Sequence, residues 1–341
     1  MPVSLVTGAA GFIGSHVTDA LIDMGHHVVA LDDFSGGFSD NVNPKAVSVN
    51  ASVTDNVAID RIFSEHQFDY VFHLAAYAAE GLSHFIKRFN YTNNLIGTVN
   101  LVNAAVNAGT IKCFIFSSSI AVYGRGQLPM SEEMTPLPED PYGIAKYAAE
   151  LDLKEAHEMF GLNYVIFRPH NVYGERQNIG DPYRNVIGIF MNQILQGKPL
   201  TVFGDGSQTR AFSYVSDVAP VIARAPEMPE TYNQVFNIGA DKAYSVLELA
   251  KTVCRVMNVP VNIRHLDARN EVVHAFSSHE KVQKYFGSLI KNVNLDTGLT
   301  RMAAWVKQSG ARSSQAFRGI EVWKNMPRSW AALAENPELS R

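Results

Sequence analysis

The chain has 341 residues, of which 46% are hydrophobic and 18% charged, and its formal net charge is −4. This size allows one or two domains with a large buried core. Because no block of like charge stands out, neither nucleic acid nor an anionic membrane is an expected partner. The sequence shows no signal-peptide pattern and no apolar run long enough to span a bilayer, so a cytoplasmic protein is expected.

Cysteines and metal ligands contribute little to the expected chemistry. Cys113 and Cys254 stand in apolar runs and are too few for a disulfide framework, so both are predicted to be reduced core residues. No cluster of Cys, His and Asp has the spacing of a metal site, and no metal is expected.

Six short apolar runs alternate with amphipathic stretches in the first half of the chain. The runs are VSLVTG, HVVALDD, AVSVN, DYVFHLAA, KCFIFSSS and NYVIFRP. Their nearly continuous apolar, β-branched character is typical of strands buried on both faces of a parallel sheet. The stretches between them predict helices at residues 12–24, 56–66, 84–108 and 142–160. This alternation predicts a doubly wound α/β fold.

The regular alternation of strand-like and helical stretches becomes less clear after Pro169. Helices are predicted at residues 185–196, 246–257 and 300–309, but the strand-like runs become short and turns become frequent. We therefore expect a smaller, mixed α/β second domain that contributes to the substrate site.

A glycine-rich loop at residues 7–14 (TGAAGFIG) follows the first predicted strand and opens the first predicted helix. Glycines let the backbone approach a pyrophosphate, which the helix N-terminus then holds. An ordinary tight turn would also explain the glycines, but Asp32 ends the second predicted strand at about the spacing of a ribose-binding carboxylate. Asp32 and Asp33 would repel a 2′-phosphate, which favours NAD over NADP.

A tyrosine and a lysine, Tyr142 and Lys146, stand four residues apart and so share one face of a predicted helix. A lysine ammonium and a positively charged nicotinamide would lower the pKa of the phenol from about 10 toward the working pH. The pair alone would occur by chance on many helices. Here it follows a strand that ends in Ser117, Ser118 and Ser119, where a hydroxyl can share the substrate proton.

The motifs TGAAGFIG, LDD, FHLAA, NNLIGT, FSSSIAVYG, PYGIAK and RPHNVYG resemble, in order, those of the extended short-chain dehydrogenase/reductases that act on nucleotide sugars. The resemblance runs from Val3 to about Phe286, and the closing IEVWKNMPRSW is similar to family tails. It implies an NAD-binding Rossmann domain in residues 1–170, to which a later segment near 211–238 also belongs. The substrate domain is implied to lie mainly in residues 171–341. It also implies a homodimer formed through a four-helix bundle.

The resemblance implies a catalytic set of Ser119, Tyr142 and Lys146. The implied NAD-binding residues are Gly8, Gly11, Phe12, Ile13, Gly14, Asp32, Asp33, Phe34, Ser35, Gly36, Ser52, Val53, Leu74, Ala75, Ala76, Asn93, Ser117, Tyr142, Lys146 and His170. Two departures affect this set: Ser52 stands where relatives carry Asp, and the segment YAAEGLS after Ala76 lacks the usual lysine.

The residues before VYG distinguish reactions within the family. Decarboxylases and dehydratases resemble S/T-x-E-VYG, and relatives that epimerise at C5 use a cysteine there, whereas this chain has Ala121. An aliphatic side chain cannot move protons at C5 or C6. The match is therefore to UDP-sugar 4-epimerases, in which a 4-keto sugar takes hydride back on its other face. A UDP-glucuronate decarboxylase and a non-catalytic NAD-sensing protein of the same fold are the alternatives.

Substrate contacts are also implied by the resemblance. The implied residues are Ser119, Asn171, Asn185, Val186, Thr201, Val202, Phe203 and the diphosphate-binding pair Arg210 and Arg269. A guanidinium fork suits a diphosphate, although a surface ion pair would explain either arginine alone.

Two positions bear on which sugar is bound. Arg184 stands where UDP-glucose 4-epimerases generally carry Asn and uronate-binding relatives place Arg, so it is predicted to pair with a C6 carboxylate; a solvated loop arginine is the alternative. Phe276 stands where a bulky residue narrows the sugar pocket, and core packing would explain it equally well. The expected substrate pairs are UDP-glucuronate/UDP-galacturonate and UDP-glucose/UDP-galactose.

Overall fold

The computed structural model describes residues 1–125, 128–268, 274–312 and 316–335. A sheet of seven parallel strands lies at its centre in the order β11-β6-β5-β4-β1-β2-β3. The strands are β1 (Val3–Thr7), β2 (His27–Asp32), β3 (Val47–Asn50), β4 (Tyr70–His73), β5 (Cys113–Ser117), β6 (Tyr164–Pro169) and β11 (Gln234–Ile238). All six predicted strands and the α/β class are confirmed.

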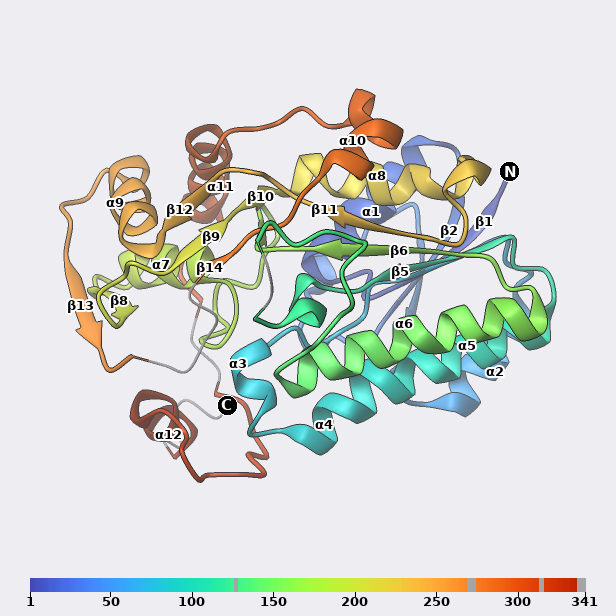
Figure 1. Ribbon diagram of the computed structural model, residues 1–341, viewed down its shortest axis with the longest axis horizontal. Helices are drawn as coiled ribbons and strands as arrows, with labels where there is room; N and C mark the ends of the chain where they lie inside the picture. Colours follow the sequence, from blue (N-terminus) through green and yellow to red (C-terminus); the bar gives the residue numbers. More distant parts are fainter. Residues whose placement is uncertain (126–127, 269–273, 313–315, 336–341) are drawn as a thin grey trace.

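Helices cover both faces of this sheet (Figure 1). Leu21 and Val221 belong to the core on one face, whereas Leu101 and Leu153 belong to the core on the other. Cys113 is a free, buried thiol in the first of these cores. The helices of the first face are α1 (Phe12–Asp23), α8 (Ala219–Arg224) and α10 (Glu280–Phe286); those of the second are α2 (Asn56–Glu65), α5 (Gly97–Ala108) and α6 (Pro141–Phe160).

The helix predicted at residues 84–108 is interrupted. It consists of α4 (Lys87–Tyr91), a π-helical turn at Thr92–Ile96 and α5, and the short α3 (Glu80–Ser83) precedes it. In the π-helical turn, the Asn94 amide bonds both the N–H and the carbonyl of Tyr77. The wider turn therefore ties this helix to the loop after β4, and π-helical turns of this kind are frequent at functional sites.

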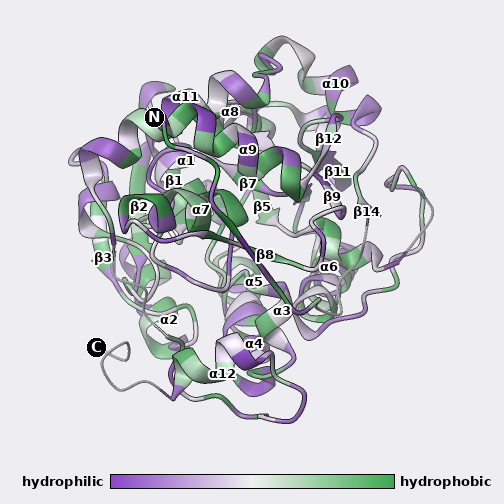
Figure 2. Ribbon diagram, turned by 90° about the vertical axis from the view of Figure 1, so that its left-hand side faces the viewer, coloured by the Kyte–Doolittle hydropathy of each residue, from purple (hydrophilic) through white to green (hydrophobic). Residues whose placement is uncertain are grey.

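A smaller lobe lies beyond the carboxyl ends of the central strands (Figure 1). Its helices α7 (Val186–Leu195), α9 (Val246–Met257) and α11 (Leu295–Ser309) share one core with β8 (Leu200–Phe203). Figure 2 shows that α8 and α9 carry both hydrophobic and hydrophilic residues, as expected for helices with one buried face. The remaining strands are β7 (Val172–Tyr173), β9 (Thr209–Ala211), β10 (Ser213–Tyr214), β12 (Ala243–Ser245), β13 (Ile263–Leu266) and β14 (His274–Ala275).

The C-terminal helix α12 (Arg328–Ala334) returns to the first lobe and packs beside α3. The Trp330 ring lies 5.4 Å from that of Tyr183 and 6.4 Å from that of Phe85. A Cβ atom on Gly81 would stand 3.1 Å from Trp330, so glycine allows this close contact. None of the helices that the structure describes is long and apolar enough to cross a membrane.

Candidate active site

The larger cavity, of about 370 Å³, opens at the carboxyl ends of the central strands. Ligands of open α/β sheets bind at this edge. Most of the residues predicted to bind NAD line it: Gly8, Gly11, Phe12, Ile13, Gly14, Asp32, Asp33, Ser35, Gly36, Val53, Leu74, Ala75, Ala76, Asn93, Ser117, Tyr142 and Lys146.

The glycine loop packs too tightly for side chains at two positions. Gly8 has a positive φ of 71°, and a Cβ atom there would lie 2.8 Å from the Ala75 backbone. A Cβ atom on Gly14 would lie 2.0 Å from the Gly8 carbonyl oxygen. The two glycines therefore let the loop and the start of α1 pack closely against the ends of β1 and β4, and Phe12, Ile13 and Gly14 line the cavity.

Asp32 stands at the end of β2 with its carboxylate held by the backbone. Its Oδ2 accepts a hydrogen bond from Ala10 N at 2.9 Å, and its Oδ1 accepts one from Phe34 N at 2.8 Å. Burial raises the pKa of Asp32, and these N–H donors oppose the rise. Asp33 adds a second carboxylate to the cavity wall, so a 2′-phosphate would meet two acids.

Tyr142 and Lys146 face the cavity from the first turns of α6. The Asp140 side chain caps this helix by accepting a hydrogen bond from Gly143 N at 2.8 Å, and Pro141 begins it. The Lys146 ammonium lies 5.9 Å from the centre of the Tyr142 ring and donates to the Ser117 carbonyl at 2.7 Å. The helix and the end of β5 therefore bring the predicted tyrosine, lysine and serines into one site.

Burial changes the pKa of both Tyr142 and Lys146. It raises the pKa of Tyr142, and a hydrogen bond with Ser119 opposes the rise. Burial lowers the pKa of Lys146 to about 7, with Glu150 acting in the opposite direction. The sequence predicted a lowered phenol pKa with Lys146 and a bound nicotinamide nearby; in the protein without the nicotinamide, burial raises this pKa instead. The positive nicotinamide would supply the opposing charge.

A smaller cavity of about 100 Å³ adjoins the first, and Ser119, Asn171 and Glu80 line both. Ala121, His170 and Arg210 also belong to its wall. Glu80, the first residue of α3, was not among the sequence-predicted site residues, because the segment YAAEGLS that contains it departs from the family pattern. Its negative charge adds to the rise in the pKa of Tyr142.

Arg184 lines the larger cavity, where its guanidinium lies 4.8 Å from the Tyr77 ring centre. Its Nε donates to Asp181 Oδ2 at 2.7 Å. The ion pair with Asp181 raises the pKa of Arg184, against the effect of burial. Arg184 and Tyr142 also interact electrostatically. The sequence-predicted arginine is therefore a well-packed cation in the same cavity as the tyrosine.

The other predicted residues lie as follows. Asn185 lines the larger cavity at the start of α7, where Val186 is the first residue, and Thr201, Val202 and Phe203 belong to β8. Phe34, Ser52, Val186, Phe276 and the three β8 residues are not among the described residues lining either cavity. Arg269 lies outside the described residues. All these site assignments remain predictions.

A family model described as the NAD dependent epimerase/dehydratase family matches residues 4–239. The chain belongs to this family. A putative UDP-glucose 4-epimerase of Methanocaldococcus jannaschii is 34% identical over 317 residues, which cover 89% of this chain and 98% of that protein. The resemblance to extended short-chain dehydrogenase/reductases is thereby confirmed.

Solved epimerase structures share the fold over most of this chain. A UDP-glucose 4-epimerase of Thermotoga maritima, solved with UDP-glucose, is 35% identical with a TM-score of 0.84, covering 91% of this chain and 99% of that one. A UDP-glucuronic acid 4-epimerase of Bacillus cereus, in complex with UDP-glucuronic acid and NAD, is 29% identical with a TM-score of 0.80. The match covers 91% of this chain and 100% of that one.

NAD is the cofactor of this epimerase-family enzyme, and the residues present fit it. The tight packing of Gly8 and Gly14 leaves the start of α1 accessible to a pyrophosphate, and Asp32 lies where a ribose-binding acid is needed. Among the described residues, no group of three or more His, Cys, Asp or Glu side chains could hold a metal ion.

Proposed function

We propose that the chain is a UDP-sugar 4-epimerase that acts through a transient 4-keto sugar. The observation that carries the proposal is the convergence of Ser119, Tyr142 and Lys146 in one cavity, with Ala121 at the position before VYG. This set can remove and return one hydroxyl proton. Ala121 has no group that could act at C5.

Tyr142 removes the proton from the C4 hydroxyl and later returns it. NAD, when bound, would supply the hydride acceptor and donor for C4. Ser119 hydrogen-bonds the phenol and orients the sugar hydroxyl, and Lys146 contributes positive charge that favours the phenolate.

We infer that the preferred pair is UDP-glucuronate and UDP-galacturonate, with UDP-glucose and UDP-galactose as the alternative pair. Arg184 supports the uronate, because a packed guanidinium suits a carboxylate that must lie near Tyr142. Asp181 and Tyr77 fix the guanidinium by an ion pair and a ring contact, so little further side-chain ordering is needed on binding.

A decarboxylase of UDP-glucuronate is the second candidate, and Glu80 favours it. Glu80 lines the smaller cavity together with Ala121. The acid that decarboxylases carry at the position of Ala121 is therefore missing here, but Glu80 brings a carboxylate to the same cavity. Its negative charge would, however, disfavour a second carboxylate beside it.

We also infer a homodimer formed through α5 and α6. The side chains of Ile144 and Leu151 are seven residues apart on α6 and are 41% and 48% exposed. Ile96, the last residue of the π-helical turn before α5, is 48% exposed. The two helices lie side by side on the outer face of the sheet (Figure 1), so pairing with a second copy would cover these apolar side chains.

The test is incubation of the purified protein, with NAD, with UDP-glucuronate and separately with UDP-glucose, followed by NMR identification of the products. Interconversion of the C4 epimers is expected, faster with the uronate. A UDP-pentose with release of CO2 would establish the decarboxylase instead. Retained NAD binding without turnover of either sugar would refute the enzymatic proposal.

A further inference from the structure

The C-terminal segment, residues 316–335, packs against residues that form the wall of the larger cavity. The centre of the Phe317 ring lies 5.3 Å from that of Tyr77 and 4.7 Å from that of Phe89, and both partners line the cavity. These distances are typical of aromatic rings in contact. Phe317 itself is not among the described residues that line either cavity, so it supports this wall from behind.

Tyr77 connects the C-terminal segment to the cation inside the cavity. Its ring has the Arg184 guanidinium 4.8 Å from its centre and also contacts the rings of Phe317 and Phe89. The Asn94 amide holds only the backbone of Tyr77, by bonding its N–H and its carbonyl. The position of the ring, and with it the surface offered to the guanidinium, therefore depends on the aromatic neighbours.

A second path reaches Arg184 through Tyr183, the residue before it. The Tyr183 hydroxyl accepts a hydrogen bond from Phe317 N at 3.3 Å, and the Tyr183 ring lies 5.4 Å from that of Trp330. Asp181 accepts from Tyr183 N through one carboxylate oxygen and from Arg184 Nε through the other. The C-terminal segment thus contacts both tyrosines on which the setting of Arg184 depends.

The C-terminal segment is itself anchored on the first lobe. The two carboxylate oxygens of Glu321 accept hydrogen bonds from Arg88 N at 2.8 Å and from Phe89 N at 3.0 Å, which are free N–H groups in the first turn of α4. Glu321 N donates to the Phe85 carbonyl at 2.8 Å. Trp330 is buried against the Phe85 ring. These contacts hold the segment in a fixed place behind the cavity wall.

We propose that Phe317 is a positioning residue that orients the Arg184 guanidinium for the carboxylate of a uronate substrate, acting through the Tyr77 ring and the Tyr183 hydroxyl. The inference rests on the proposed function and makes the C-terminal segment a determinant of its sugar selectivity. Loss of the Phe317 ring removes the support behind Tyr77. A small displacement of a guanidinium weakens a charged hydrogen bond to a carboxylate, whereas the C6 hydroxyl of a neutral hexose has no charge to lose by it.

Kinetics with UDP-glucuronate and UDP-glucose test this role. Phe317→Ala is expected to lower kcat/KM for UDP-glucuronate about tenfold more than for UDP-glucose, with NAD affinity within about twofold of the wild type. Phe317→Tyr keeps the ring and should restore the selectivity. Phe63→Ala is the matched control, because Phe63 also packs against an aromatic ring, that of Phe68, but lines neither cavity. Unchanged selectivity in Phe317→Ala would overturn the proposal.

A double-mutant cycle with Arg184 separates positioning from general loosening of the fold. In the Arg184→Ala background, Phe317→Ala should cause no further change in the ratio of the two kcat/KM values. A further change as large as in the wild-type background would show that Phe317 acts elsewhere and would overturn the inference alone. Unchanged selectivity in Arg184→Ala itself would refute the uronate assignment as well.

Calorimetry with the same two sugar nucleotides distinguishes this inference from the proposed function. A protein that binds both without converting either would refute the 4-epimerase. In that case a tenfold weaker preference for UDP-glucuronate in Phe317→Ala would still support the positioning role, and an unchanged preference would overturn it.

Discussion

Arg168 and Glu150 form a buried, bidentate ion pair. Nε of Arg168 donates to Oε1 of Glu150 at 2.9 Å, and Nη2 donates to Oε2 at 2.5 Å. Ser118 also donates to this carboxylate, at 2.5 Å. The pair joins the end of β6 to α6 one turn beyond Lys146, so it holds the helix that carries the tyrosine and lysine.

Replacement of Arg168 by Met should strongly destabilise the fold. The change leaves the fully buried Glu150 charge unpaired, so the free energy of unfolding should fall by about 3–5 kcal/mol. The exposed Arg61–Glu65 pair provides the matched control, because Arg61→Met should change stability by less than about 1 kcal/mol. Urea denaturation measures both, and equal small losses would show that the buried pair is dispensable.

Tyr142→Phe should abolish most of the turnover while NAD remains bound. Loss of the phenolic oxygen removes the proton acceptor, so kcat should fall by about 100-fold to 10,000-fold. Tyr285→Phe, on α10 and away from both cavities, should keep its rate. If the variant bound NAD normally and retained most of its activity, Tyr142 would not be the base.

Glu80→Gln should change the pH dependence of the reaction. The Glu80 charge raises the pKa of Tyr142, so its removal lowers that pKa and lets the phenolate persist at lower pH. The acidic limb of kcat/KM should move to lower pH by up to about one unit. A pH-rate series with Glu155→Gln as control measures the shift; movement toward higher pH would contradict this electrostatic relationship.

Arg184→Ala should lower the activity on UDP-glucuronate more than the activity on UDP-glucose. Loss of a charged hydrogen bond to a C6 carboxylate should lower kcat/KM for UDP-glucuronate about 10-fold to 100-fold more than for UDP-glucose. Arg88→Ala, whose side chain is 88% exposed, is the control. Equal losses with the two sugars would assign Arg184 to NAD or to loop packing.

Local patterns were sufficient to predict most of the fold. The helices at residues 246–257 and 142–160 correspond to the structure almost residue for residue, and each strand run contains one observed strand. Burial on both faces of a sheet and one-sided burial of a helix leave distinct periods in the sequence. The interruption at Thr92–Ile96 was missed, since it depends on Asn94 bonding the distant Tyr77 backbone.

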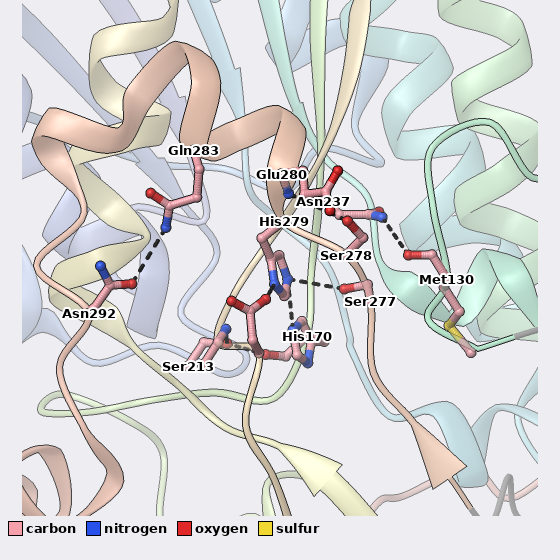
Figure 3. Close-up of polar contacts among 12 residues, drawn as sticks. Met130, His170, Ser213, Asn237, Ser277, Ser278, His279, Glu280, Gln283 and Asn292 are labelled. Carbon is pink, nitrogen blue, oxygen red and sulfur yellow. Dashed lines mark hydrogen bonds and ion pairs between the residues drawn. The ribbon is translucent and has the colours of Figure 1, made fainter.

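The site could be predicted only where a motif is continuous in sequence. The glycine loop and the Tyr142–Lys146 spacing are of this kind. Glu80 reaches the cavity from the start of α3, in a segment with no matching motif. His279 contacts His170 across 109 positions (Figure 3), a pairing created by tertiary packing alone. The helix that contains Trp330 was similarly unexpected, because its apolar face is covered by α3 rather than by a neighbouring segment.

Conversion of UDP-glucuronate and UDP-glucose in D2O, followed by NMR, most directly tests the claim that Tyr142 and NAD act only at C4. The hydride that leaves C4 should return to the same carbon, so the 4-epimer should contain no carbon-bound deuterium. Deuterium at C5, or a labelled UDP-pentose with CO2, would contradict the account and show that another acid, with Glu80 the first candidate, moves protons at the sugar ring.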